Sequence, residues 1–541
     1  MLKIKHILLM GALVIGATSC KDYLDQAPLD LLSSDNFYQT ASQANQGILG
    51  VYADLRYTTV YEYWNMSEVR SDNLWVEPQP NGQRDYSDIG TFRATSELGT
   101  FESAWDTWYK LIYDANVALQ KIPNTTFSKE TIRDQFLNEA HFLRGLAYFE
   151  LVRLFGNVPV LTQPTSVGDA NSTPQTAGTD VIKNVVIPDL EQALNLPDKG
   201  SLVNGLGASV TGRADKMAAN ALLARVYMTL AGYPYNDATA TAKAKTYLAT
   251  VLAKKSTYFA PSIDEWRKQW IPETSYKNKY SIFAIQYTVG GYGNPSIFEM
   301  SPSLPPSYTT IRIFGNSIYM AKDMRYEFDK TFSTGTKDLR GEGYTVLDGF
   351  DAETNYQAYT NTKDTVKVDG VTSNVYIYSM FYKYLPTLRK IKALGLTTAV
   401  EASMSDYYDW PVNFPVLRIE DMMLLNAEIQ IQEGNISGAM AAVNEIRKRA
   451  GCDLVSTTVD AATAMKYVKR ERRLELMGEG VRWFDEVRYG SWQSDIRNKF
   501  ARYNNPTGTS LDNVADGRYL YPIPQNQMSI TPGLYQQNTG Y

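Results

Sequence analysis

The sequence is poor in the side chains from which many catalytic and metal sites are built. It contains only two histidines and two cysteines among 541 residues. His6 and Cys20 lie near the N-terminus, so the rest of the chain has only His141 and Cys452. A Ser-His-Asp or Cys-His arrangement would have to use His141 alone, and a site with several histidine ligands is excluded. Cys452 is left without a partner, so disulfides do not hold the fold, and we predict a buried apolar role for it.

The chain also lacks an excess of basic residues and a second long apolar run. Lys and Arg number 53 against 58 Asp and Glu, which gives a formal net charge of −5. This balance argues against binding to nucleic acid. A transmembrane helix needs about 20 consecutive apolar residues, and no apolar run after residue 20 is close to that length. We therefore expect the mature chain not to cross a membrane.

The first twenty residues have the pattern of a bacterial export signal that ends at a lipidated cysteine. Lysines precede a short apolar segment, and small residues then lead directly to Cys20. The apolar segment is too short to span a bilayer as a mature helix. We assign 1–19 to a signal peptide and 20–35 to a tether lipidated at Cys20. The alternative is an ordinary signal peptide with a chance cysteine.

Helical periodicity is clear in several separate blocks. The segment 420–449 fits a tetratricopeptide unit with Gly434 in its turn, and 214–231 with 239–254 fits a second helical pair. Such pairs cannot bury their faces alone, so we expect at least three of them to stack. Spacings of three and four residues also predict one long helix, ended by Gly156, with a buried stripe of Phe136, Ala140, Leu143, Ala147, Leu151 and Leu154.

We predict a mainly α fold in which a tetratricopeptide-like helical-repeat scaffold packs against a loop-rich irregular lobe with a few short strands. The single fold over 36–541 is divided into a scaffold, mainly 36–56, 97–160, 210–256 and 413–490, and a lobe, mainly 57–96, 260–412 and 491–541. The chain has 38 Tyr and 9 Trp against 19 Phe. Tyr and Trp combine an apolar face with a polar tip, so aromatic-rich loops on a helical scaffold predict a binding module.

Several segments carry a family resemblance when they are taken in order along the chain. They are CKDYLDQAP from Cys20, NEAHFLRGLAYFELVRLFGNVPV (138–160), NFPVLRIEDMMLLNAE (413–428), VKRERRLELMGEGVRWFDEVRYG (468–490) and YLYPIPQNQMSITPGLYQQNTGY (519–541). Together they resemble the SusD/RagB family of Bacteroidetes outer-membrane lipoproteins. The tail departs from the family pattern, because YQQNTGY lacks the proline that more often follows its asparagine.

The resemblance implies a function without catalysis. We assign no cofactor and no metal-ligating residue. It implies an outer-membrane, lipid-anchored and surface-exposed protein that captures a glycan, or in some members a peptide. It also implies a SusC-type TonB-dependent transporter barrel as the partner that receives the ligand. A structural lid with little affinity of its own is a third possibility.

The family's ligand contacts come from two regions that correspond to 57–96 and 288–312. A sugar ring stacks its C–H face on Trp or Tyr, and its hydroxyls need polar partners. The predicted ligand-binding residues are Trp64, Trp75, Arg84, Tyr86, Tyr292, Asn294 and Tyr308. For each aromatic residue, core packing is the alternative.

Acidic residues in the sequence leave an enzymatic alternative open. A surface-anchored glycoside hydrolase could draw two carboxylates from Asp72, Asp85 or Glu299. The dense charges of 466–488 are predicted to be structural instead. Their apolar residues form a buried stripe, and opposite charges flank it at helical pairing distances. We assign no catalytic residue there.

Overall fold

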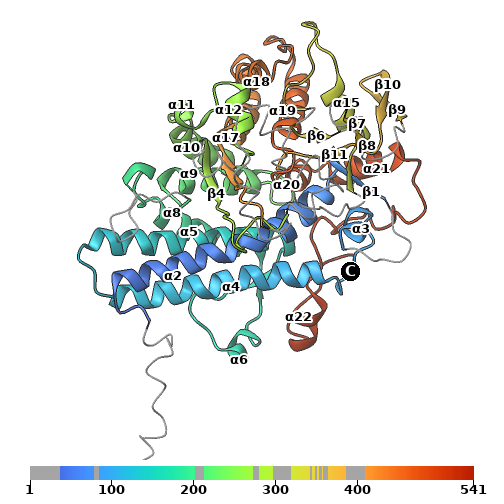
Figure 1. The fold of residues 1–541 in the computed structure, drawn as a ribbon. Coiled ribbons are helices and arrows are strands. Elements are labelled where there is room, and N and C mark those ends of the chain that lie inside the picture. The colour runs from blue at the N-terminus through green and yellow to red at the C-terminus, as the bar shows by residue number, and fades with distance from the viewer. Residues whose placement is uncertain are drawn as a thin grey trace, which may run out of the picture.

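Helices form most of the described chain, and the strands are short and paired two by two (Figure 1). The structure is a computed structural model. It describes residues 37–77, 85–201, 212–271, 280–296, 318–341, 344–347, 350–351, 356–357, 363–384 and 409–541. The prediction of a mainly α fold with a few short strands is confirmed. The assignment of segments to a scaffold and a lobe stays a prediction.

Three long helices from the first third of the chain lie side by side (Figure 1). They are α2 (Ala41–Asp54), α4 (Gly99–Lys121) and α5 (Glu130–Phe155). Thr40 begins α2 with a capping box, in which its hydroxyl accepts from the Gln43 amide at 3.3 Å. All six residues of the stripe predicted on α5 are fully buried, and Gly156 follows the helix at φ +72°. The long predicted helix is confirmed.

Two predicted helical pairs form the repeat part of the scaffold. They are α9 (Lys216–Ala231) with α10 (Ala240–Leu252), and α17 (Ile419–Gln432) with α18 (Ile436–Arg449). Gly434 turns the chain between α17 and α18 at φ +80°. The helix α10 also packs on α17, and α19 (Ala461–Glu475) packs on both α17 and α18. These two predicted pairs therefore stack on each other, as predicted.

The remaining helices are shorter. They are η2 (Leu55–Tyr57), η3 (Thr59–Val69), α3 (Asp85–Gly90), η4 (Ile122–Asn124), α6 (Val167–Ala170), α7 (Gly178–Val181), η5 (Ile182–Val186), α8 (Ile187–Ala193), η6 (Lys199–Ser201), α11 (Lys255–Tyr258), α12 (Ile263–Lys268), α15 (Lys322–Asp329), α20 (Arg482–Arg488), α21 (Trp492–Arg502) and α22 (Gln525–Ile530). No helix among the described residues is long and apolar enough to span a bilayer.

The strands form antiparallel pairs, of which β1–β5 and β4–β12 join parts of the chain that are far apart in sequence. The pairs are β1 (Leu74–Val76) with β5 (Ile318–Met320), β2 (Val158–Pro159) with β3 (Gln175–Thr176), β4 (Ser281–Ile285) with β12 (Phe414–Arg418), β6 (Val346–Leu347) with β11 (Met380–Phe381), β7 (Phe350–Asp351) with β8 (Tyr356–Gln357), and β9 (Lys363–Val368) with β10 (Val371–Tyr376). The β4–β12 pair is wholly buried, so it fixes the base of the loop that follows β4.

The prediction that 57–96 is an irregular loop is wrong for most of its described part. The π-helix η3 occupies 59–69, and β1 and α3 follow. Every residue from Glu62 to Val69 is buried. A helix that is buried on all sides shows no apolar stripe in its sequence, so periodicity could not reveal it.

The charged segment 466–488 is structural, as predicted, but its charges are buried. Its apolar residues Leu474 and Met477 lie in the core, and so do the carboxylates of Glu471 and Glu475. The carboxylates pair mainly with arginines of other elements and not with neighbours one helical turn away. Arg449, for example, donates to Glu475 at 2.6 Å. The segment joins α17, α18 and α19 through a network of ion pairs.

Candidate functional site

The loop after β4 presents Tyr292 on a narrow turn. Backbone hydrogen bonding between Thr288 and Tyr292 closes the turn at 3.1 Å. Gly290 and Gly291 form its tip at φ +91° and +85°, conformations that favour glycine. The buried Asp409 carboxylate accepts from both glycine amides, at 2.7 and 2.8 Å. The turn is therefore fixed by a buried carboxylate, while Tyr292 is 65% exposed.

Arg56 joins this turn to the end of α2. Its guanidinium lies 5.0 Å from the ring centre of Tyr57 and 6.0 Å from that of Tyr292. Its Nε donates to the Gly293 carbonyl at 3.4 Å. Tyr57 is 45% exposed, so Arg56 lies in contact with two exposed rings. We call Arg56, Tyr57 and Tyr292 the aromatic platform.

The platform offers the two kinds of contact that a sugar needs. The phenol rings provide flat apolar faces. Both hydroxyls and the guanidinium provide polar groups next to them. Cation–π attraction between Arg56 and the rings restricts the freedom of these side chains before any ligand arrives.

Asn294 lies below the platform and not on its surface. It is fully buried, and its side-chain amide donates to the Val412 carbonyl at 3.0 Å. Its Oδ1 accepts from the Ser296 hydroxyl at 2.6 Å. The prediction of a ligand contact is corrected here, because these bonds use the side chain to hold the turn against the 409–413 segment.

Three predicted stacking rings are core residues in this structure. Trp64 has no exposed surface and lies 5.2 Å from Phe381, centre to centre. Trp75 is stacked on Tyr503 at 3.8 Å with 7° between the ring planes. Tyr86 is also buried. The alternative of core packing holds for all three rings, so we do not carry them forward as ligand contacts.

Other predicted residues lie outside the described part of the chain. They are the lipidation site Cys20, the ligand candidates Arg84 and Tyr308, and the acid Glu299. Their roles stay predictions. Of the predicted ligand residues that the structure describes, Tyr292 is the exposed one.

Sequence reasoning missed Arg56 and Tyr57. The exposure of Tyr57 could have been predicted from helical spacing. The buried positions of α2 continue to Leu55 at that spacing. Tyr57 falls off that stripe, which predicts exposure at the helix end. Nothing in the sequence indicated that Arg56 meets a turn more than two hundred residues away.

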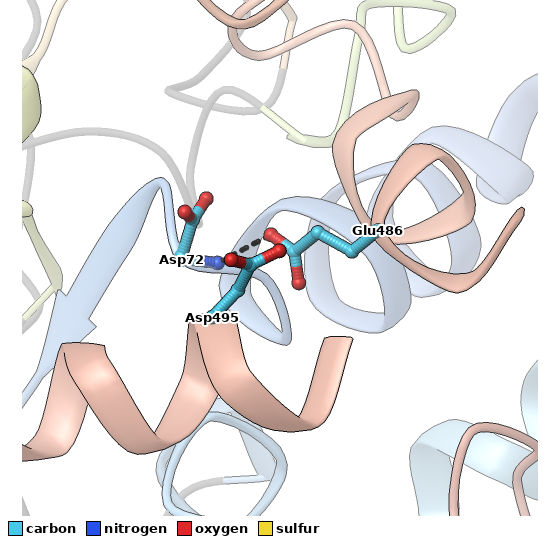
Figure 2. Close-up of side chains that lie close together, drawn as sticks. All are labelled: Asp72, Glu486 and Asp495. Carbon is cyan, nitrogen blue, oxygen red and sulfur yellow. Dashed lines mark hydrogen bonds between the residues drawn. The ribbon is translucent and has the colours of Figure 1, made fainter. Parts of the chain in front are cut away.

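Three carboxylates converge at a second place in the structure, where Asp72, Glu486 and Asp495 come from the segment before β1, from α20 and from α21 (Figure 2). Their oxygens lie within 4.8 Å of one another. Arg482 pairs with Asp72 at 2.8 Å and with Glu486 at 3.0 Å. Arg473 pairs with Asp72 at 3.1 Å. The acids are therefore already neutralised by guanidinium groups, and the cluster has the chemistry of an ion-pair network and not of a metal site.

The same contacts bear on the hydrolase alternative. Burial opposes ionisation of Asp72, but Arg473 and Arg482 outweigh it and hold the pKa of its carboxyl well below the ordinary range. Burial and the neighbouring Asp72 charge raise the pKa of Glu486 well above its ordinary value. The Asp85 carboxylate accepts from the Thr100 amide at 2.8 Å at the start of α4. Both candidate acids that the structure describes are thus engaged in structural contacts.

Comparison with known proteins assigns a family to the whole chain. The model of the SusD family matches residues 267–541, and a model described as "Starch-binding associating with outer membrane" matches residues 22–228. SusD-like protein P38 of Formosa agariphila is 25% identical, and the alignment covers 100% of both chains. The starch-binding protein SusD of Bacteroides thetaiotaomicron is 24% identical, with 98% of each chain covered.

A solved structure shares this fold. A solved structure of a laminarin-binding SusD-like protein superimposes with a TM-score of 0.70 at 22% identity, and covers 93% of this chain and 100% of its own. Together with the family model that spans half of the sequence, these findings place the chain in the SusD family, to which it belongs.

Proposed function

We propose that this protein is a non-catalytic, lipid-anchored binding protein that captures a glycan at the cell surface and delivers it to a SusC-type TonB-dependent transporter. The aromatic platform is the observation that carries the proposal, because exposed rings beside an arginine suit a sugar better than any other surface described here. Two relatives have names that state a particular glycan, which is starch for one and laminarin for the other. These names support a glycan as the ligand of this protein, but they do not indicate a particular linkage.

Replacing Tyr292 with alanine is expected to weaken glycan binding by about tenfold or more, because one stacking face and one hydroxyl are lost. Stability should not change measurably, since the side chain is mostly exposed. Isothermal titration with maltooligosaccharides, laminarin and other soluble glycans measures the effect. Tyr113→Ala is the matched control, because this tyrosine of α4 is 49% exposed and is not among the rings that Arg56 contacts.

Binding of a peptide pool with no heat from any glycan would move the assignment to a peptide-binding member of the family. If wild type and Tyr292→Ala bind a glycan with equal affinity, the platform is not part of the binding site. A reducing-sugar assay tests the absence of catalysis, and product release that depends on Asp72 or Asp85 would contradict it.

Anchoring depends on Cys20 in this proposal. Cys20→Ser is expected to move much of the protein out of the membrane fraction, since the lipid is the direct attachment to the bilayer that we propose. Immunoblots of fractionated cells measure the change, and protease accessibility on intact cells tests exposure at the surface. Cys452→Ser is the control and should stay in the membrane fraction. Unchanged fractionation of Cys20→Ser would contradict the anchor.

A further inference from the structure

A cavity lies where the end of α5 meets α7, the loop after α9 and residues 519–520. Its volume is about 490 Å³, which is in the range of small-molecule sites. None of the residues that line it belongs to the aromatic platform. The cavity is therefore a separate feature that the proposed function does not use.

The floor of this cavity is closely packed. Gly156 has φ +72°, and a Cβ added there would lie 2.7 Å from a methyl group of Leu520. A Cβ on Gly178 would lie 2.8 Å from the Gly156 carbonyl oxygen. The Asn157 side-chain oxygen accepts from the Gly178 amide at 3.0 Å. The hollow is thus shaped by backbone contacts and does not need a ligand to form it.

Two aromatic rings and several unused polar groups line the cavity. The rings are those of Tyr235 and Tyr519. Neither tyrosine hydroxyl has a hydrogen-bond partner among the described residues, and the same holds for the Thr179 hydroxyl and the Asn157 side-chain NH₂. Apolar ring surface next to free donors and acceptors is the combination that a sugar ring matches. A purely apolar ligand would leave these polar groups without partners.

The charges at the cavity favour a neutral ligand. Lys183 pairs with Asp237 at 3.4 Å, and both residues line the cavity. The other oxygen of Asp237 accepts from the Thr239 amide at 3.0 Å, which fixes the carboxylate in place. Because the two charges compensate each other, an anionic ligand would meet Asp237 and a cationic one would meet Lys183. A neutral polyhydroxylated ring can accept from Lys183 and donate to Asp237 at once.

From these observations we infer that the cavity is a second saccharide site, which takes a neutral sugar unit between Tyr235, Tyr519 and the Lys183–Asp237 pair. The inference rests on the proposed function in that it assumes a glycan-binding protein. It adds a binding position away from the platform, so that one glycan chain or two separate sugars could occupy the protein.

Saturation-transfer NMR on the full mature protein tests the inference with D-glucose, D-galactose, D-mannose and L-fucose as probes. We expect contact signals from at least one of these sugars. Tyr235→Ala, which removes one ring, should weaken that binding by about tenfold. Adding Thr179→Tyr, which fills the cavity, to Tyr292→Ala, which removes the platform's contribution, should abolish the signal. This double variant decides the test if Tyr235→Ala does not fold. Tyr292→Ala alone should reduce the signal to the part that comes from the cavity, and should not abolish it.

The outcomes separate this site from the platform. Absence of contact with every probe sugar, or contact that persists when Thr179→Tyr is added to Tyr292→Ala, overturns the second site. Loss of contact in Tyr292→Ala also overturns it, because the sugar then binds at the platform. A failure of the proposed function would be recognised by another measurement. In that case Tyr292→Ala and wild type would bind oligosaccharides with the same affinity.

Discussion

Glu475→Ala is expected to destabilise the fold by about 3–5 kcal/mol, the cost of breaking a buried ion-pair network by removing one partner. Glu475 has no exposed surface. One of its oxygens accepts from Trp266 at 2.8 Å, from Arg418 at 3.0 Å and from Arg449 at 2.6 Å. The other accepts from Arg340 at 2.8 Å. Alanine would leave three buried guanidinium groups without this shared negative charge.

Urea unfolding followed by circular dichroism measures the loss of stability. Glu433→Ala is the matched control, because the Glu433–Lys245 pair at 2.6 Å is about half exposed on both sides. Exposed pairs of this kind contribute about 0–1 kcal/mol. A Glu475→Ala protein as stable as Glu433→Ala would show that solvent or rearrangement compensates the arginines, contrary to the expectation.

The same network predicts how stability depends on pH. Burial alone would raise the pKa of Glu475, but Arg449, Arg418 and Arg340 outweigh it and hold the pKa well below its ordinary value of 4.5. A carboxyl group whose pKa is lowered on folding stabilises the protein above its unfolded-state pKa. This stabilisation is lost as the pH falls below about 4.5 toward the folded-state pKa. The wild type should therefore lose stability in this acidic window more steeply than Glu475→Gln does.

The helical scaffold could be predicted from the sequence because its signals are local. The stripe from Phe136 to Leu154 and the turn glycine Gly434 each lie within one element or one hairpin. Their spacing alone identifies the helix face and the helix end. The structure confirms both, since the stripe is buried and Gly434 has a positive φ.

The candidate site could be predicted only in part, because it is assembled from distant segments. Tyr292, a predicted ligand-binding residue, is exposed, but its partner Arg56 lies in η2, directly after α2. Asp409, which holds the turn, comes from a third segment. No spacing rule connects these positions. The sequence also does not distinguish a tyrosine or tryptophan in the core from one on the surface. For this reason the buried position of Trp75 could not be predicted.

Trp64 separates these two roles of an aromatic residue most sharply. Trp64→Ala is expected to destabilise the fold by about 3–5 kcal/mol, because a large ring is removed from a packed core and leaves a cavity. The ring is fully buried in η3 and packs on Phe381. Its Nε1 has no hydrogen-bond partner among the described residues, so packing and not polar contact accounts for the expected loss. Trp64→Phe keeps most of the ring and should cost much less.

Binding distinguishes this core role from the ligand contact predicted for Trp64. Folded Trp64→Ala protein should bind a glycan with wild-type affinity, whereas Tyr292→Ala should keep its stability and lose affinity. Thermal unfolding and isothermal titration on the same two samples measure both quantities. A Trp64→Ala variant with wild-type stability and weakened binding would return this ring to the ligand site. The opposite pattern would mean that Tyr292 takes part in recognition, while Trp64 acts only by packing in the core.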